Sequence, residues 1–225
     1  MRTAALRHRL ERLKHGNHFG MLYLAVALCL FVSGSVTITK ALVDQRSIAE
    51  TRNLGAIPTH DPTKQANTGH YLDFATPTAI SIPAIEVDSP LISVGKASDG
   101  AIDTPKAPDF DKAAWYRDSP APGQYGASVI VGHVDSYARD NGASVFYSLG
   151  RLKPGDTIVV TRSDHTNATF KVYATREFNR KNMPTDQVYN ANSANAELRL
   201  ITCAGTFDTA TNEYTDNTVI FAQLI

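Results

Sequence analysis

Two segments of the chain place a reactive side chain where an apolar, strand-like run ends. The run from Ile130 to Gly132 leads into His133, and the run from Leu200 to Thr202 leads into Cys203. A thiolate is a strong nucleophile, and a nearby imidazole can take the thiol proton and later protonate a departing amine. These residue types therefore predict nucleophilic attack on an amide, provided that the fold brings the two strand ends together.

The competing interpretation of both residues is structural. The chain has two cysteines, and Cys29 lies in an apolar stretch where a small hydrophobic residue is expected. Cys203 is then the one thiol outside that stretch, so it has no partner for an internal disulfide. Strand-end cysteines are often inert core filler, and a histidine after a glycine is often a turn residue. Because 70 residues separate His133 from Cys203, spacing alone does not show that they meet.

The elements that must position these residues are short strands. Segments rich in Val, Ile, Thr and aromatic residues, separated by Pro- and Gly-containing turns, predict strands. They cover residues 79–83, 85–87, 91–95, 128–134, 157–162, 168–177, 197–203 and 217–225. One short helix is expected over 185–191. About eight strands with almost no helix predict an all-β, closed or partly closed barrel.

The N-terminal third predicts a membrane attachment. Residues 1–18 carry five basic residues and one acidic residue, and no charged residue occurs from Phe19 to Thr39. A span of about 20 apolar residues reaches across a bilayer, so we expect a cytoplasmic tail over 1–18 and an anchor over 19–40. A cleavable signal peptide is the alternative. Residues 41–76 predict an extracytoplasmic stalk or linker, and residues 77–225 a single globular domain.

Composition argues against two other classes of protein. The net charge is zero, and residues beyond position 18 are slightly acidic, which does not fit a nucleic-acid-binding surface. His133, His165 and Cys203 lack the close spacing of a metal site, so neither a metal nor another cofactor is expected.

Several longer strings resemble the sortase family, and among them the class F sortases of actinobacteria. They are SIPAIEVDSPLISVG, WYRDSPAPGQYGASVIVGHVDS, VFYSLGRLKPGDTIVV, the LITC-x-G string ending in Gly205, and VIFA in the last strand. Their order and spacing run through nearly all of residues 77–225. The resemblance implies an eight-stranded sortase-type barrel with one or two short helices behind an N-terminal transmembrane helix.

The resemblance also implies roles for individual residues. Cys203 matches the family nucleophile and His133 the family histidine. The family has an arginine early in its final strand, and here Asn217, or else Thr215, stands at that place. Thr202, Gly205 and Asp135 are expected near bound substrate, with Asp135 either orienting His133 or lying in a solvated turn.

The implied function is a membrane-anchored cysteine transpeptidase. It would cleave an LPxTG-like sorting signal through a Cys203 thioester and transfer the protein to an amine of a peptidoglycan precursor. Two alternatives stay open: a non-catalytic, sortase-like peptide-binding module, and a thiol hydrolase of the envelope. An envelope structural protein with an inert thiol is a further, purely structural alternative.

Overall fold

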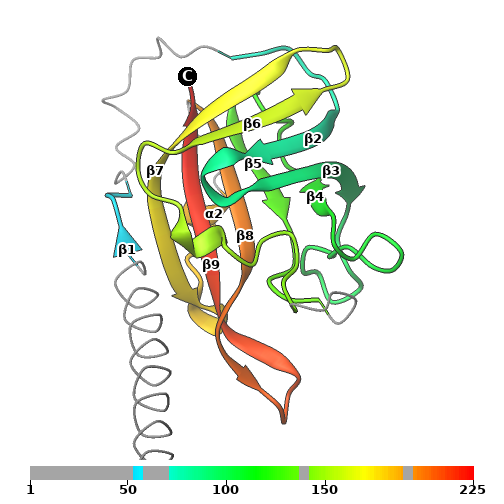
Figure 1. Ribbon diagram of the computed structural model, residues 1–225, viewed down its shortest axis with the longest axis vertical. Helices are drawn as coiled ribbons and strands as arrows, with labels where there is room; N and C mark the ends of the chain where they lie inside the picture. The colour runs from blue at the N-terminus through cyan, green and yellow to red at the C-terminus, as the bar shows by residue number, and fades with distance from the viewer. Residues whose placement is uncertain (1–52, 58–70, 137–141, 190–194) are drawn as a thin grey trace, which may run out of the picture. The chain divides into compact units, whose positions relative to one another are not determined.

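The computed structural model describes residues 53–57, 71–136, 142–189 and 195–225 (Figure 1). The chain divides into two compact units, Met1–Ala49 and Glu50–Ile225, and all described residues belong to the second. The expected tail and anchor, and most of the expected stalk, lie outside the described residues. Among the residues described, no helix has both the length and the apolar character needed to cross a membrane.

One nine-stranded sheet forms the domain (Figure 1). Its strands are β1 (Asn53–Leu54), β2 (Pro77–Ile82), β3 (Val87–Val94), β4 (Ala113–Tyr116), β5 (Gly126–Val131), β6 (Thr157–Arg162), β7 (Asn167–Asn179), β8 (Ala196–Asp208) and β9 (Glu213–Leu224). The order is β1-β7-β6-β2-β3-β4-β5-β8-β9, and β9 pairs back onto β7. That pairing closes the eight strands β2 to β9 into a ring, with β1 added beside β7. The predicted all-β, closed eight-stranded barrel is therefore confirmed.

Helical structure is sparse in the described part of the chain, as predicted. Three short 3₁₀ turns occur, η1 (Pro83–Ile85), η2 (Leu149–Arg151) and η3 (Arg180–Asn182), together with one α-helical turn, α2 (Thr185–Val188). The helix expected over 185–191 begins at the predicted residue but ends at Val188, and residues 190–194 lie outside the described part.

Three strand predictions need correction. β4 was not predicted, because its four residues are too short for a period-2 pattern to stand out. Residues 83–85 form η1 at the corner between β2 and β3, and β3 is one continuous strand. Most importantly, β8 does not end at Cys203 but continues to Asp208 in a hairpin with β9, which Figure 1 shows extending beyond the barrel.

Two hydrophobic clusters occupy opposite faces of the sheet. Along β8, Leu198 and Leu200 belong to the first cluster, whereas Ile201 belongs to the second. Successive side chains of a strand point to opposite faces, so Cys203 continues the face of Ile201. On β5, Val131 belongs to this second cluster as well.

β5 and β8 are neighbouring parallel strands of the sheet (Figure 1). All six residues of β5 are buried, which is typical of a parallel strand covered on both faces. The register pairs Val129 with Arg199 and Val131 with Ile201. Because the two strands run in the same direction, the chain leaves β5 at Val131 beside Ile201, while β8 continues to Asp208.

Candidate active site

His133 and Cys203 each lie two residues beyond the last paired residues of β5 and β8. Val131 pairs with Ile201, and the Gly132 amide donates a hydrogen bond of 3.2 Å to the Ile201 carbonyl. His133 lies two residues beyond Val131, and Cys203 lies two residues beyond Ile201. Adjacent strands lie about 4.8 Å apart, so this register brings the backbone entering His133 beside the backbone entering Cys203.

Gly132 permits the chain to leave β5 at this point. A Cβ atom there would lie 2.7 Å from Cγ1 of Val145 and 2.7 Å from Cδ2 of Phe146. The Phe146 amide in turn donates to the His133 carbonyl at 3.0 Å. The absent side chain therefore lets the segment 144–146 pack directly against the backbone that carries the imidazole.

The imidazole of His133 is held by the connection between β3 and β4. Its Nε2 lies 2.9 Å from the Pro105 carbonyl oxygen, and its ring stacks on Phe110 with centroids 3.9 Å apart and planes 4° from parallel. A carbonyl only accepts hydrogen bonds, so this contact requires a proton on Nε2. In the neutral ring, Nδ1 is then the nitrogen able to accept a proton.

Cys203 is half-buried inside β8 rather than at the end of a strand. Burial raises the pKa of its thiol, and the carboxylates of Asp135 and Glu213 raise it further, while the Arg180 guanidinium lowers it. Desolvation is the largest of these effects. The thiol is therefore protonated at neutral pH, and its nucleophilic form depends on a base that can remove the proton.

Asn217 lies beside Cys203 in the register of β8 and β9. The resemblance put Asn217 early in the last strand, and it is the fifth residue of β9. Its side-chain amide is directed to Met183, with 3.9 Å between Nδ2 and Sδ. A thioether is a weak acceptor, so this contact is easily exchanged for a stronger one.

Asp135 does not hydrogen-bond to His133 among the described residues. Its carboxylate accepts a hydrogen bond of 2.7 Å from the Tyr214 hydroxyl on β9. Asp135 therefore ties the segment after His133 to the hairpin that carries Cys203. It lies close enough to act on the pKa of Cys203.

Thr202 and Gly205 flank the thiol in different ways. Thr202 faces the side of β8 opposite to Cys203, and its Oγ1 is buried without a hydrogen-bond partner. Gly205 has φ +80°, and the register of β8 and β9 is irregular between Ala204 and Phe207. The backbone at Gly205 is thus an irregularity inside a long hairpin. Its left-handed conformation favours glycine.

Sequence reasoning missed the residues that surround the site from other elements. Arg180, on η3 after β7, forms an ion pair of 2.9 Å with Glu213 of β9. Pro105 and Phe110 lie in the connection between β3 and β4. No local pattern marks these residues, because their relation to His133 and Cys203 comes from strand pairing alone.

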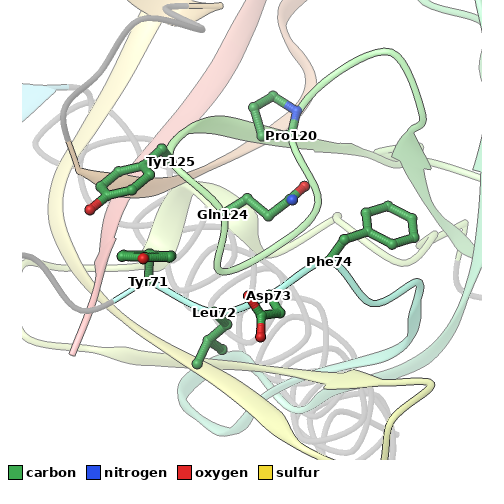
Figure 2. A pocket seen from close by; sticks show the side chains of 7 residues that line it. All are labelled: Tyr71, Leu72, Asp73, Phe74, Pro120, Gln124 and Tyr125. Carbon is green, nitrogen blue, oxygen red and sulfur yellow. The ribbon is translucent and has the colours of Figure 1, made fainter.

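A surface pocket lies at the other end of β5. Figure 2 shows Tyr71 and Tyr125 facing each other beside Leu72, Asp73 and Gln124. The two rings have centroids 4.5 Å apart. Tyr125 precedes β5 and His133 follows it, which separates the two by roughly 25 Å along an extended chain. This pocket is therefore not part of the candidate active site.

The described residues contain no group of three or more His, Cys, Asp or Glu side chains arranged to hold a metal ion.

A sortase-domain family model matches residues 80–225. Sortase A from Corynebacterium diphtheriae matches with TM-score 0.50 and 21% identity, covering 67% of this chain and 60% of that chain. A lid mutant of the same sortase A matches with TM-score 0.50 and 16% identity, covering 84% of this chain and 94% of that chain. A Clostridium perfringens sortase D5 transpeptidase matches with TM-score 0.47 and 19% identity, covering 67% of this chain and 79% of that chain. No match was found among curated proteins.

The closed barrel and the matched region together define the class of protein. The family model spans more than half of the chain, so the chain belongs to the sortase family. Members of this family are cysteine transpeptidases. At these identities the solved structures show the shared fold alone.

Proposed function

We propose that this protein is a membrane-anchored sortase of the class F type, with Cys203 as nucleophile and His133 as proton-transfer partner. The single observation that supports the proposal is the parallel register of β5 and β8, whose last pair, Val131 and Ile201, precedes His133 and Cys203 by two residues each. The raised pKa of the thiol adds a reason for a base at this place, since the neutral form is not reactive.

The proposed reaction has two acyl transfers. The Cys203 thiol gives its proton to Nδ1 of His133, and Sγ attacks the carbonyl carbon of the Thr–Gly bond in an LPxTG-like signal. The C–N bond breaks, a thioester forms, and the imidazolium protonates the departing amine. An amine of a peptidoglycan precursor then attacks the thioester, loses a proton to His133, and releases the thiol as the new amide forms.

The oxyanion formed in each step needs donors or positive charge. In place of the family arginine, Asn217 offers an amide that can donate to the oxyanion after leaving Met183. Arg180 contributes a positive potential, because it lowers the pKa of Cys203. Thr202, Gly205 and Asp135 remain candidates for the substrate-binding surface.

The proposal includes a location. Residues 1–18 form the cytoplasmic tail, residues 19–40 the single membrane span, and residues 41–76 the stalk of an extracytoplasmic domain. Retention of the full chain in the membrane fraction after carbonate washing supports an anchor. Recovery of a shortened, soluble chain from the medium would instead support a cleaved signal peptide.

The test is turnover of an LPxTG-like peptide by the full chain in detergent, carrying Cys29→Ala so that Cys203 is the one thiol. We expect cleavage, a peptide thioester on Cys203 by mass spectrometry, and an amide product when triglycine is added. Cys203→Ala should abolish all three, and His133→Ala should lower the rate by at least about a hundredfold. Undiminished cleavage by Cys203→Ala would falsify the proposal.

The same assay separates the alternatives. Cleavage whose product is unaffected by added amine indicates a hydrolase. Saturable binding of a labelled peptide without any thioester indicates a non-catalytic binding module. Circular dichroism and the unfolding midpoint of each variant establish whether a loss of rate reflects chemistry or a loss of fold.

A further inference from the structure

The segment Pro105–Asp111, here called the strap, contacts His133 and the chain that follows it at three places. The Pro105 carbonyl accepts from Nε2 of His133, and Phe110 covers one face of the imidazole. The Asp111 carboxylate accepts hydrogen bonds from Ser136 at 3.1 Å and from Ser144 at 2.8 Å. The first two contacts touch the imidazole itself, whereas the third holds the strap in place.

Ser136 and Ser144 lie on either side of residues 137–143 in the sequence. Ser136 is 4% exposed and Ser144 is 5% exposed, so their hydrogen bonds to the half-buried Asp111 carboxylate are partly shielded from water. Hydrogen bonds to an ionised acceptor are stronger than neutral ones, and shielding strengthens them further. Each carboxylate oxygen of Asp111 accepts a hydrogen bond from one serine, so this single side chain holds the strap to both Ser136 and Ser144.

We propose that Asp111 is a positioning residue for His133. By fixing the strap, it keeps the Pro105 carbonyl against Nε2 and Phe110 against the ring, and so selects the tautomer whose Nδ1 is free to accept a proton. Asp111 acts through the strap and does not touch the reacting atoms. The expected effect on kcat rests on the proposed transpeptidase function, whereas the expected effect on the His133 tautomer does not.

The test compares Asp111→Ala with Asp109→Ala in the full chain. Asp109 lies in the same strap, but its carboxylate pairs with Lys112 on the surface at 2.6 Å, so it is a matched control. Ring ¹⁵N spectra are recorded on histidine-labelled protein near pH 8.5, where ordinary imidazoles are neutral. Among the seven histidines, the His133 signals are identified by their loss in His133→Gln.

The wild type and Asp109→Ala should show one His133 tautomer, protonated at Nε2, with ring protons shifted upfield by Phe110. Asp111→Ala should show a tautomer mixture and lose most of that upfield shift. With a cleavable peptide, kcat should fall about ten- to a hundredfold while KM changes less than about twofold, because a small displacement of a reacting group is costly. Asp111→Asn should recover part of the loss by retaining one acceptor oxygen.

An unchanged tautomer and ring shift in Asp111→Ala would overturn the inference, as would a tautomer mixture with unchanged kcat. If Asp111→Ala fails to fold, Ser144→Ala removes one of the two bonds and should give smaller changes in the same direction. If the wild type cleaves no sorting peptide while the tautomer responds as expected, the positioning inference stands and the proposed function fails.

Discussion

The Tyr214 hydroxyl on β9 donates a hydrogen bond of 2.7 Å to the Asp135 carboxylate, two residues beyond His133. Tyr214 precedes Asn217 on the strand that pairs with Cys203. This bond therefore connects the segment that follows His133 to the hairpin of β8 and β9, independently of the pairing between β5 and β8.

Removing that hydroxyl should loosen the geometry of the site more than the fold. We expect Tyr214→Phe to lower kcat/KM for a sorting peptide several-fold and the free energy of unfolding by about 1 kcal/mol. Steady-state kinetics and urea denaturation measure the two effects. Tyr125→Phe, at the other end of β5, is the control and should leave both unchanged. Equal kinetics in the two variants would show that the bond does not hold the site together.

The reactivity of Cys203 should depend on pH as expected for a desolvated thiol. Burial raises its pKa, so iodoacetamide should modify it more slowly at pH 7 than it modifies an exposed cysteine peptide. The rate should rise with pH, with a midpoint above that of the peptide. A midpoint below that of the peptide would mean that a thiolate–imidazolium pair already prevails in the free protein.

The same raised pKa has a consequence for stability. The native state holds the Cys203 proton more tightly than the unfolded state, so this contribution is complete below the unfolded pKa. It is lost as the pH rises through the folded pKa. The wild type should therefore lose stability relative to Cys203→Ala over that alkaline range, as measured by urea unfolding. A difference between the two proteins that stays constant with pH would contradict the assignment.

Arg180 and Glu213 should shift the pKa of Cys203 in opposite directions. Arg180→Gln should raise it and slow alkylation, whereas Glu213→Gln should lower it and speed alkylation, each by about two- to threefold at low salt. Both side chains are about half-exposed, so 0.5 M salt should reduce the differences. Lys181→Gln is the control for a lost neighbouring cation. Effects of the same sign from Arg180→Gln and Glu213→Gln would point to a structural disturbance instead.

Gly205 should tolerate alanine worse than a glycine with similar backbone in open space. Its φ is +80°, and an added Cβ would lie 2.1 Å from Oδ2 of Asp216. Gly100, with φ +85°, has no heavy atom within 4 Å of that position. Gly100→Ala should therefore cost about 1 kcal/mol of unfolding free energy from backbone strain. Gly205→Ala should cost at least about 1 kcal/mol more, since Asp216 must move. Equal costs would show that the hairpin adapts freely.

The barrel was predictable because its strands are rich in Val, Ile, Thr and aromatic residues and are separated by Pro- and Gly-containing turns. The segment 157–162 coincides with β6, and 197–203 lies within β8. Asn217 was expected early in the final strand on the sequence resemblance alone, whereas its pairing with Cys203 is known from the structure. The roles of the site residues remain predictions that the proposed experiments test.

The rest could not be read from local patterns. The strap contacts His133 through a proline carbonyl and a phenylalanine face, groups that occur throughout any chain. Arg180 reaches the surroundings of Cys203 because β7 pairs with β9, a relation between residues far apart in sequence. Trp115 is buried in the first hydrophobic cluster, a position that no local pattern marks.

The parallel contact between β5 and β8 has a consequence for how the protein becomes active. β6 and β7 are made between the two strands, so the imidazole emerges from the ribosome well before the thiol that it serves. Contacts between distant segments form late and slowly in folding. Under the proposed function, a chain still being synthesised therefore carries no competent nucleophile, and reactivity begins only when the last strands have joined the ring.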